Sequence, residues 1–323
     1  MKNFKKYLQV VLGIGISVVF LYLAFSKVDM KETLSLMTKV KWYYLILAFI
    51  LPIIGVFVRS YRWQIILHQN VPYKHFVEAT YVGLFINNIL PFRMGDFAQA
   101  YFLAAKSNLS KSTTFSTVVL ERITDILPPF LILVVGSFFA FLPEQIGRDK
   151  IFIAVTAIFT ILFFIIKFQK NIVGLIEKAF PNSTFGRKLH GFIDNLYSGM
   201  SFIKDPKRFT KVALLTLLLW NIYAFTAYSC ILAFGIPINY LQTMLVIGVV
   251  SISVTIPSSP GYVGTWEFFS ILALSMFKIG KSMGLSFALL YHLVGWLPIT
   301  LIGFIIVLKS GMSLSKLEQS PEE

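Results

Sequence analysis

Long apolar runs separated by short basic segments dominate the chain. Six of these runs are long enough to cross a hydrocarbon layer of about 30 Å as helices. They cover about residues 7–26, 42–66, 112–142, 150–168, 211–235 and 282–308. A membrane barrel would instead show short segments of alternating polarity. The pattern therefore predicts an all-α, polytopic helical membrane protein with about six full spans.

Two further apolar segments, 74–106 and 240–278, are interrupted near their centres. Proline, glycine and polar residues break the first within 87–97 and the second within 255–268. The apolar arms on either side are short for a complete crossing. Irregular backbone is tolerated at membrane depth only against protein or a water-filled cavity. We therefore expect each segment to form a re-entrant hairpin that returns to the side from which it entered.

The two halves of the chain resemble each other. A shift of 170 residues superimposes a Lys-Ser pair and a proline, and a shift of 169 superimposes a proline and a glycine of the two breaks. The matching pairs are Lys111/Lys281, Ser112/Ser282, Pro128/Pro298, Pro91/Pro260 and Gly95/Gly264. We expect an inverted repeat of span, hairpin and span, with repeat one at about 42–142 and repeat two at about 211–308.

The basic residues support this topology. With both termini in the cytoplasm, most of the 29 Lys and Arg residues fall on the cytoplasmic side. The stretch at about 170–205 is basic and amphipathic, so we expect a helix lying on the cytoplasmic leaflet; an ordinary soluble connector is the alternative. Residues 1–310 then form one transmembrane domain, and 311–323 a short polar tail, in a multi-pass protein of the cell membrane.

Composition excludes several other classes of protein. The chain is 56% hydrophobic and only 14% charged, unlike a soluble domain. Its net charge of +14 is gathered at the ends of apolar runs, which argues against a nucleic-acid partner. The single cysteine, Cys230, allows no intrachain disulfide. No spacing of His, Cys, Asp and Glu suggests a metal, and we expect no cofactor.

The first break carries polar groups that suit an anion. Asn87, Asn88, Arg93 and Asp96 lie around Pro91 and Gly95, the two residues expected to reverse the chain. Arginine binds phosphate in a bidentate manner, and a helix starting after the break would present free amides to an anion. Alternatively, Asp96 serves only as an N-cap.

A second group of charges lies in the run at 112–142. Glu121 and Asp125 are four residues apart on one helical face, and Arg122 is spaced to pair with Asp125. Ionisable residues within a bilayer are candidates for function. The alternative is a structural ion network that holds helices together.

The second break contains Ser258, Ser259, Gly261, Gly264 and Glu267. Its two prolines, Pro257 and Pro260, are expected to interrupt the helix. The amides of this tip are suited to a lipid phosphate. Glu267 is a candidate for carrying protons or for meeting Arg93 or Arg122 of the other repeat.

Three more residues are candidate headgroup or interface contacts. Arg59 and Arg62 close the second apolar run, and Trp266 lies beside Glu267. For the two arginines, interfacial anchoring and capture of a lipid headgroup are both open. For the tryptophan, interfacial anchoring and a role in the site are both open. His292 aligns with Arg122 in the repeat and has no partner evident in the sequence.

Three stretches, NNILPFRMGD, VVLERITDIL and PSSPGYVGTWE, resemble the signature stretches of the lysylphosphatidylglycerol synthase transmembrane-region family, also called flippase-like membrane proteins. The resemblance extends over about residues 7–310. It implies a membrane protein of bacteria or archaea, from a family whose best-known members move aminoacylated phospholipid between leaflets. The matching positions are Asn88, Pro91, Arg93, Gly95, Asp96, Glu121, Arg122, Asp125, Pro260, Gly261, Gly264 and Glu267.

Those members also carry a soluble aminoacyl-transferase domain, and we expect this chain to be a stand-alone module without it and without enzymatic activity. The leading hypothesis is a flippase or transporter of a phospholipid, aminoacylated or anionic, or of another lipid-linked headgroup. The alternatives are an ion- or proton-coupled transporter of a soluble solute and a membrane partner of a phospholipid-modifying enzyme of the lysyltransferase type.

Overall fold

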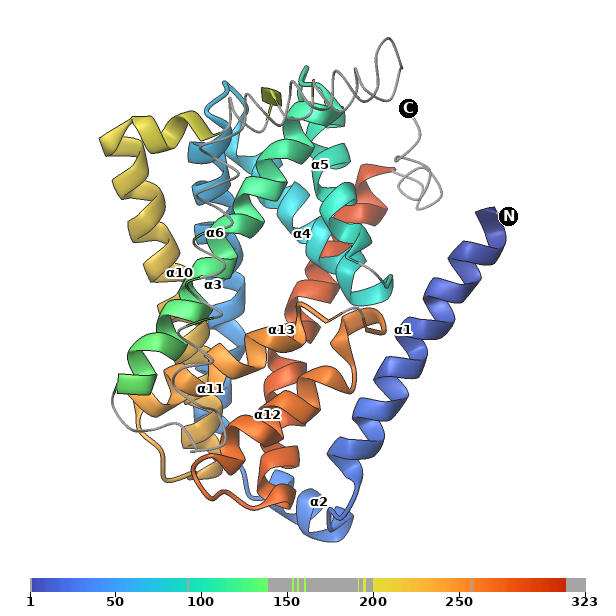
Figure 1. Ribbon diagram of the computed structural model, residues 1–323, viewed down its shortest axis with the longest axis vertical. Coiled ribbons are helices and arrows are strands. Elements are labelled where there is room, and N and C mark those ends of the chain that lie inside the picture. Colours follow the sequence, from blue (N-terminus) through green and yellow to red (C-terminus); the bar gives the residue numbers. More distant parts are fainter. Residues whose placement is uncertain are drawn as a thin grey trace.

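The computed structural model describes residues 2–91, 93–138, 200–256 and 258–311, together with a few isolated positions between 139 and 199. Every regular element within these residues is a helix, as expected (Figure 1). The predicted span at 150–168, most of the predicted amphipathic helix at 170–205, the tail beyond Gly311 and Pro257 lie outside the described residues.

The helices follow the apolar runs closely. They are α1 (Lys2–Phe25), α2 (Met30–Thr38), α3 (Trp42–Leu67), α4 (Tyr73–Ile89), α5 (Met94–Lys106), α6 (Lys111–Phe138), η1 (Met200–Lys204), α10 (Pro206–Phe234), α11 (Tyr240–Ser253), η2 (Pro260–Tyr262), α12 (Thr265–Ser275) and α13 (Lys281–Ser310). Helices α3, α10 and α13 are each long and apolar enough to cross a membrane. Helix α6 has 28 residues, begins with Lys111 and carries three further charged residues near its centre.

The first broken segment forms two helices, α4 and α5, that pack against each other. The chain reverses at Arg93, whose backbone lies in the left-handed region with φ of 54°. Pro91 lies in the break, but Gly95 does not: it is the second residue of α5, so the prediction that it breaks the helix was wrong. A Cβ on Gly95 would overlap the carbonyl oxygen of Gly83. Gly95 is therefore the residue that lets α4 and α5 approach closely.

The second broken segment forms α11 and α12, which also pack against each other, with η2 between them. Two glycines shape this break through backbone conformations that other residues rarely adopt. Gly261 has φ of 66° and Gly264 has φ of 91°. A Cβ on Gly264 would lie 2.5 Å from the carbonyl oxygen of Ser17, so α1 packs directly on the start of α12.

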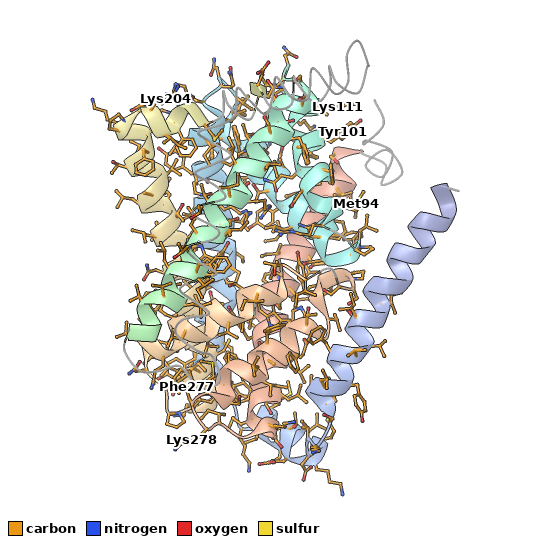
Figure 2. The ribbon with its side chains drawn as sticks, viewed as in Figure 1. Met94, Tyr101, Lys111, Lys204, Phe277 and Lys278 are labelled. Atoms are coloured by element: carbon orange, nitrogen blue, oxygen red, sulfur yellow. The ribbon has the colours of Figure 1, made fainter. Side chains whose placement is uncertain are left out.

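The same order of elements occurs twice, as α3–α4–α5–α6 and as α10–α11–α12–α13. Figure 1 shows the α4–α5 unit in one half of the molecule and the α11–α12 unit in the other, with their breaks directed towards the middle. There α4 contacts η2. Figure 2 shows Lys111 and Lys204 at one end of the molecule and Lys278 at the opposite end.

Gly95→Ala tests the close approach of α4 and α5. We expect the added methyl group to force these helices apart and to cost about 1–3 kcal/mol, as overpacking does in other cores. The thermal midpoint of the purified protein in detergent measures the effect. Gly284→Ala is the matched control, because its Cβ would meet Ile271 at an ordinary 3.5 Å. Equal midpoints for the two variants would contradict this account of the packing.

Candidate functional site

A cavity of about 470 Å³ lies where the two breaks meet. Apolar side chains form much of its wall, among them Pro52 of α3, Leu133 of α6 and Val250 of α11. Several polar side chains also line it, some of which the sequence singled out. These are Arg59, Asn88, Arg93, Arg122, Asp125, Tyr223, Thr226, Ser251, Thr255, Tyr262, Trp266, His292 and Trp296. The wall is thus mostly apolar and carries a smaller set of polar and charged side chains.

A buried ion cluster borders the polar part. Arg59 and Arg62 are three residues apart on α3 and face Glu121 and Asp125, four apart on α6. Arg59 Nε lies 2.6 Å from Glu121 Oε1, and Arg59 Nη2 lies 2.9 Å from Asp125 Oδ2. Arg62 Nη2 lies 2.6 Å from Asp125 Oδ1. The spacings on the two helices are complementary, so each arginine reaches a carboxylate.

This cluster argues against interfacial anchoring of Arg59 and Arg62, one of the two roles that the sequence left open for them. The side chain of Arg62 is fully buried and that of Arg59 is 7% exposed. The carboxylates of α6 explain the difference. A charged group within apolar surroundings is costly unless it is paired. Pairing with Glu121 and Asp125 therefore draws both guanidinium groups inward.

The first break is joined to the cluster through Arg122. Arg122 Nη1 lies 3.3 Å from Asp125 Oδ2, as its spacing predicted, and Nη2 lies 3.0 Å from Asp96 Oδ1. Asn87 donates a hydrogen bond to Asp96 and accepts one from the amide of Gly95 at 2.8 Å. A continuous chain of charges and hydrogen bonds thus runs from α6 to the start of α5.

Positive charge exceeds negative charge in this region. Four arginines, Arg59, Arg62, Arg93 and Arg122, accompany three carboxylates, Asp96, Glu121 and Asp125. Arg93 is the least neutralised, because its Nε is 3.6 Å from Asp96 and its side chain is 37% exposed. It also lines the cavity.

Arg93 is held in a strained backbone conformation. Its φ of 54° is uncommon for a residue with a side chain. Such strain is concentrated at binding and catalytic sites in proteins. The conformation, the exposure and the unbalanced charge together make Arg93 the residue of this cavity best suited to meet an anion.

The second break presents a different pair. Glu267 Oε1 lies 2.5 Å from His292 Nδ1, and His292 Nε2 lies 2.8 Å from the carbonyl oxygen of Gly261. Glu267 Oε2 accepts a hydrogen bond from the amide of Gly264 at 2.6 Å. The prediction that Glu267 meets Arg93 or Arg122 was therefore wrong. The carboxylate is held instead between the amide of Gly264 and His292 of α13.

Trp266 also lies inside the molecule. Its ring stacks on His292 with 5.3 Å between the centroids, and it lines the cavity. Its indole nitrogen is buried and has no hydrogen-bond partner among the described residues. The structure thus places Trp266 at the site, whereas the sequence left an anchor at the membrane interface equally open.

Ser258 and Ser259 hold the second break in place and do not appear in the described lining of the cavity. The amide of Ser259 donates to Ser17 Oγ of α1 at 2.8 Å. Thr265 Oγ1 donates to Ser258 Oγ at 3.3 Å. Both serines therefore fix η2 against its neighbours.

The two broken units carry similar pairs. Asp96 on α5 pairs with Arg122 on α6, and Glu267 on α12 pairs with His292 on α13. Arg122 and His292 align in the sequence, whereas the two carboxylates do not occupy the same position of the repeat. Sequence analysis missed Gln99, a fully buried side chain that donates to Glu121 Oε2 at 3.0 Å. Its polarity within an otherwise apolar stretch of α5 was the available clue.

Within the part of the chain that the structure describes, no three His, Cys, Asp or Glu side chains gather as metal ligands. The arrangement instead offers a guanidinium group, an indole N–H and apolar walls around one cavity. Those groups suit a ligand that is anionic at one end and apolar at the other.

Arg62→Met tests the energetic role of the ion cluster. Removing Arg62 breaks its 2.6 Å ion pair with Asp125, which keeps Arg59 and Arg122 as partners, so the cost should lie below the about 3–5 kcal/mol of a buried charge left without any partner. We expect a fall in thermal midpoint larger than that of the control. Lys74→Met is the control, because Lys74 is 79% exposed in its pair with Glu78. A single Arg62→Met variant as stable as the parent protein would contradict the assignment.

Comparison with known proteins agrees with the resemblance seen in the three motifs. The chain is 27% identical to a UPF0104 membrane protein of Pyrococcus horikoshii, over 95% of this chain and 97% of that protein. It is 28% identical to a UPF0104 membrane protein of Methanocaldococcus jannaschii, over 91% of this chain and 92% of that protein. The glycosyltransferase AglD of Haloferax volcanii is 22% identical over 88% of this chain and 52% of its own length.

The family described as the lysylphosphatidylglycerol synthase TM region matches residues 10–303. This match includes both broken units, the ion cluster and the Glu267–His292 pair. The chain therefore belongs to the lysylphosphatidylglycerol synthase TM region family of multi-pass membrane proteins.

Proposed function

We propose that this protein moves a lipid with an anionic headgroup between the two leaflets of a membrane. The cavity between the two breaks is the observation that carries the proposal. It combines an unbalanced arginine with an extensive apolar wall, at a site built from helices long enough to span a bilayer. An amphiphile requires both kinds of surface, whereas a small soluble anion requires only the first.

The size of the cavity indicates which part of the lipid it holds. A volume of about 470 Å³ lies at the lower end of the range for drug-sized ligands. We infer that it takes a headgroup with its phosphate, while the acyl chains remain in the surrounding lipid. The phosphate would face Arg93, and apolar residues such as Leu133 and Val250 would face the glycerol and the first methylene groups.

The helix lengths support re-entrant hairpins. Helices α4, α5, α11 and α12 contain 17, 13, 14 and 11 residues. At 1.5 Å per residue each is shorter than about 26 Å, less than a typical hydrocarbon core of about 30 Å. We infer that the two units enter from opposite faces as an inverted repeat. In this architecture the site is exposed to each side in turn by movement of one repeat against the other.

The relatives suggest which headgroups to test. The family name contains lysylphosphatidylglycerol, an aminoacylated phospholipid. One relative bears the name of a glycosyltransferase, which makes a sugar-bearing lipid a second choice. The described cluster has an excess of positive charge, so we place an anionic phosphate at Arg93 in either case.

Proteoliposomes test the proposal through Arg93→Asn. Asparagine tolerates left-handed backbone, so we expect this variant to keep its thermal midpoint while it loses the guanidinium group. Transport of fluorescent phosphatidylglycerol to the outer leaflet, followed by dithionite quenching, should fall to the rate of protein-free vesicles. Fluorescent phosphatidylcholine is the substrate control, and Lys74→Gln is the control for loss of one positive charge.

Wild-type protein that moves neither phosphatidylglycerol nor its lysyl derivative would overturn the proposal. Uptake of a soluble anion without movement of lipid would point instead to a solute transporter. Unchanged lipid transport by a folded Arg93→Asn protein would leave transport standing but would remove Arg93 from the site.

A further inference from the structure

We propose that Glu267 and His292 form a proton-binding site that couples proton movement to lipid transport. The coupling rests on the proposed function, whereas the proton site rests on hydrogen-bond geometry alone. His292 lines the cavity at the second break and Glu267 contacts it from α12, and their separation of 2.5 Å is short even for a charge-assisted bond.

The geometry requires one proton more than a neutral imidazole beside an ionised carboxylate would hold. His292 Nε2 lies 2.8 Å from the carbonyl oxygen of Gly261, which can only accept, so Nε2 must donate. A neutral imidazole has one N–H, so Nδ1 would then face the Glu267 carboxylate with a lone pair. Both contacts are satisfied only by an imidazolium beside a carboxylate, or by a neutral imidazole beside a protonated carboxyl group. Each of these states contains the additional proton.

The other unit provides a built-in comparison. Between the corresponding helices α5 and α6, Asp96 pairs with Arg122, whose guanidinium keeps its proton under all physiological conditions. Histidine is the side chain whose charge changes most readily near neutral pH. Each unit therefore links a carboxylate to a basic side chain. The charge of the basic side chain is permanent in the first unit, whereas in the second unit this side chain can gain and lose a proton.

The groups around the Glu267–His292 pair connect it to the cavity. The side chains of α1 that the structure describes, those of Ile14–Phe25, include no Asp, Glu, Lys or Arg. Helix α11 contains none either. Tyr262 of η2, Tyr223 of α10 and Tyr291 of α13 line the same cavity, as do Asn88 of α4 and the stacked ring of Trp266.

Fixed charges also border that cavity on other elements. They are Arg59 of α3, Arg93 before α5, and Arg122 and Asp125 of α6. An anion bound at Arg93 would offset this positive potential.

Loss of the proton would release the second break. A neutral His292 and an ionised Glu267 cannot keep both hydrogen bonds, so one of the links to Glu267 or Gly261 must break. Gly261 belongs to η2, which contacts α4. A Cβ on Gly261 would lie 3.4 Å from the carbonyl oxygen of Asn88. The proton thus helps to fix η2 where it contacts α4, and its departure would allow η2 to shift against the first break.

Spectroscopy in lipid nanodiscs tests the proton site independently of transport. The chain has only four histidines, so a His292→Gln spectrum identifies the ¹⁵N signals of His292 by difference. At neutral pH we expect either an imidazolium pattern at His292 or an infrared carboxylic-acid band that disappears in Glu267→Gln. His75, 3.3 Å from Glu78 and more exposed, is the internal reference. A neutral His292 beside an ionised Glu267 would overturn the inference.

Glu267→Gln tests the coupling. A glutamine can accept from the Gly264 amide and donate to His292 Nδ1, so it reproduces the protonated state without releasing a proton. We expect the variant to remain folded, while transport of fluorescent phosphatidylglycerol loses its response to an imposed pH gradient.

The possible failures are distinguishable. Wild-type transport that ignores a pH gradient, with the proton found on the pair, would overturn coupling and leave the proposed function intact. Absence of any lipid transport by the wild type would overturn the proposed function and with it the coupling, while the spectra still decide the proton site.

Discussion

Charge buried in apolar surroundings governs the arrangement of this protein. Glu121 and Asp125 lie near the middle of α6, and a charged carboxylate there is stable only with a partner. Arg59 and Arg62 supply that partner from α3, and Arg122 extends the network to Asp96 of α5. One set of ion pairs thereby fixes the relative positions of three helices. The first break is held where its strained arginine borders the cavity.

The second break is held by weaker and more adjustable contacts. Hydrogen bonds to Glu267 and His292 and direct packing of Gly264 on α1 replace the arginine network. The two units thus share an order of elements and a similar acid–base pair but differ in the permanence of charge. We propose that the first unit stays fixed through its ion pairs, while the second unit, whose hydrogen bonds can break, moves against it.

Local patterns in the sequence were enough for most of the helices. The apolar runs predicted α3, α10 and α13 to within a few residues, apart from the start of α10, which begins earlier at Pro206. Interruption by proline and polar residues predicted that each broken segment forms two helices. The role of Gly95 was predicted wrongly, because a glycine at a helix start looks the same in sequence whether it breaks the helix or permits close packing. Only the overlap with Gly83 distinguishes the two cases.

The candidate site was predicted as a set of residues and not as a set of contacts. Asp96, Glu121, Arg122 and Asp125 were identified because ionisable side chains are conspicuous in an apolar stretch. The partners of Arg59, Arg62 and Glu267 were missed or assigned wrongly. Arg59 and Asp125 are 66 residues apart, and no local pattern states which charged residues of distant helices will face one another.

The sequence by itself determined the membrane character, the helices and the family, because these depend on short-range periodicity, composition and motif. Tertiary structure alone decided which residues face one another where the two breaks meet, that the arginines of α3 turn inward and that Glu267 selects His292. The reason is that a buried charge takes the partner that packing brings within reach. That choice is made between whole helices, after each has already formed.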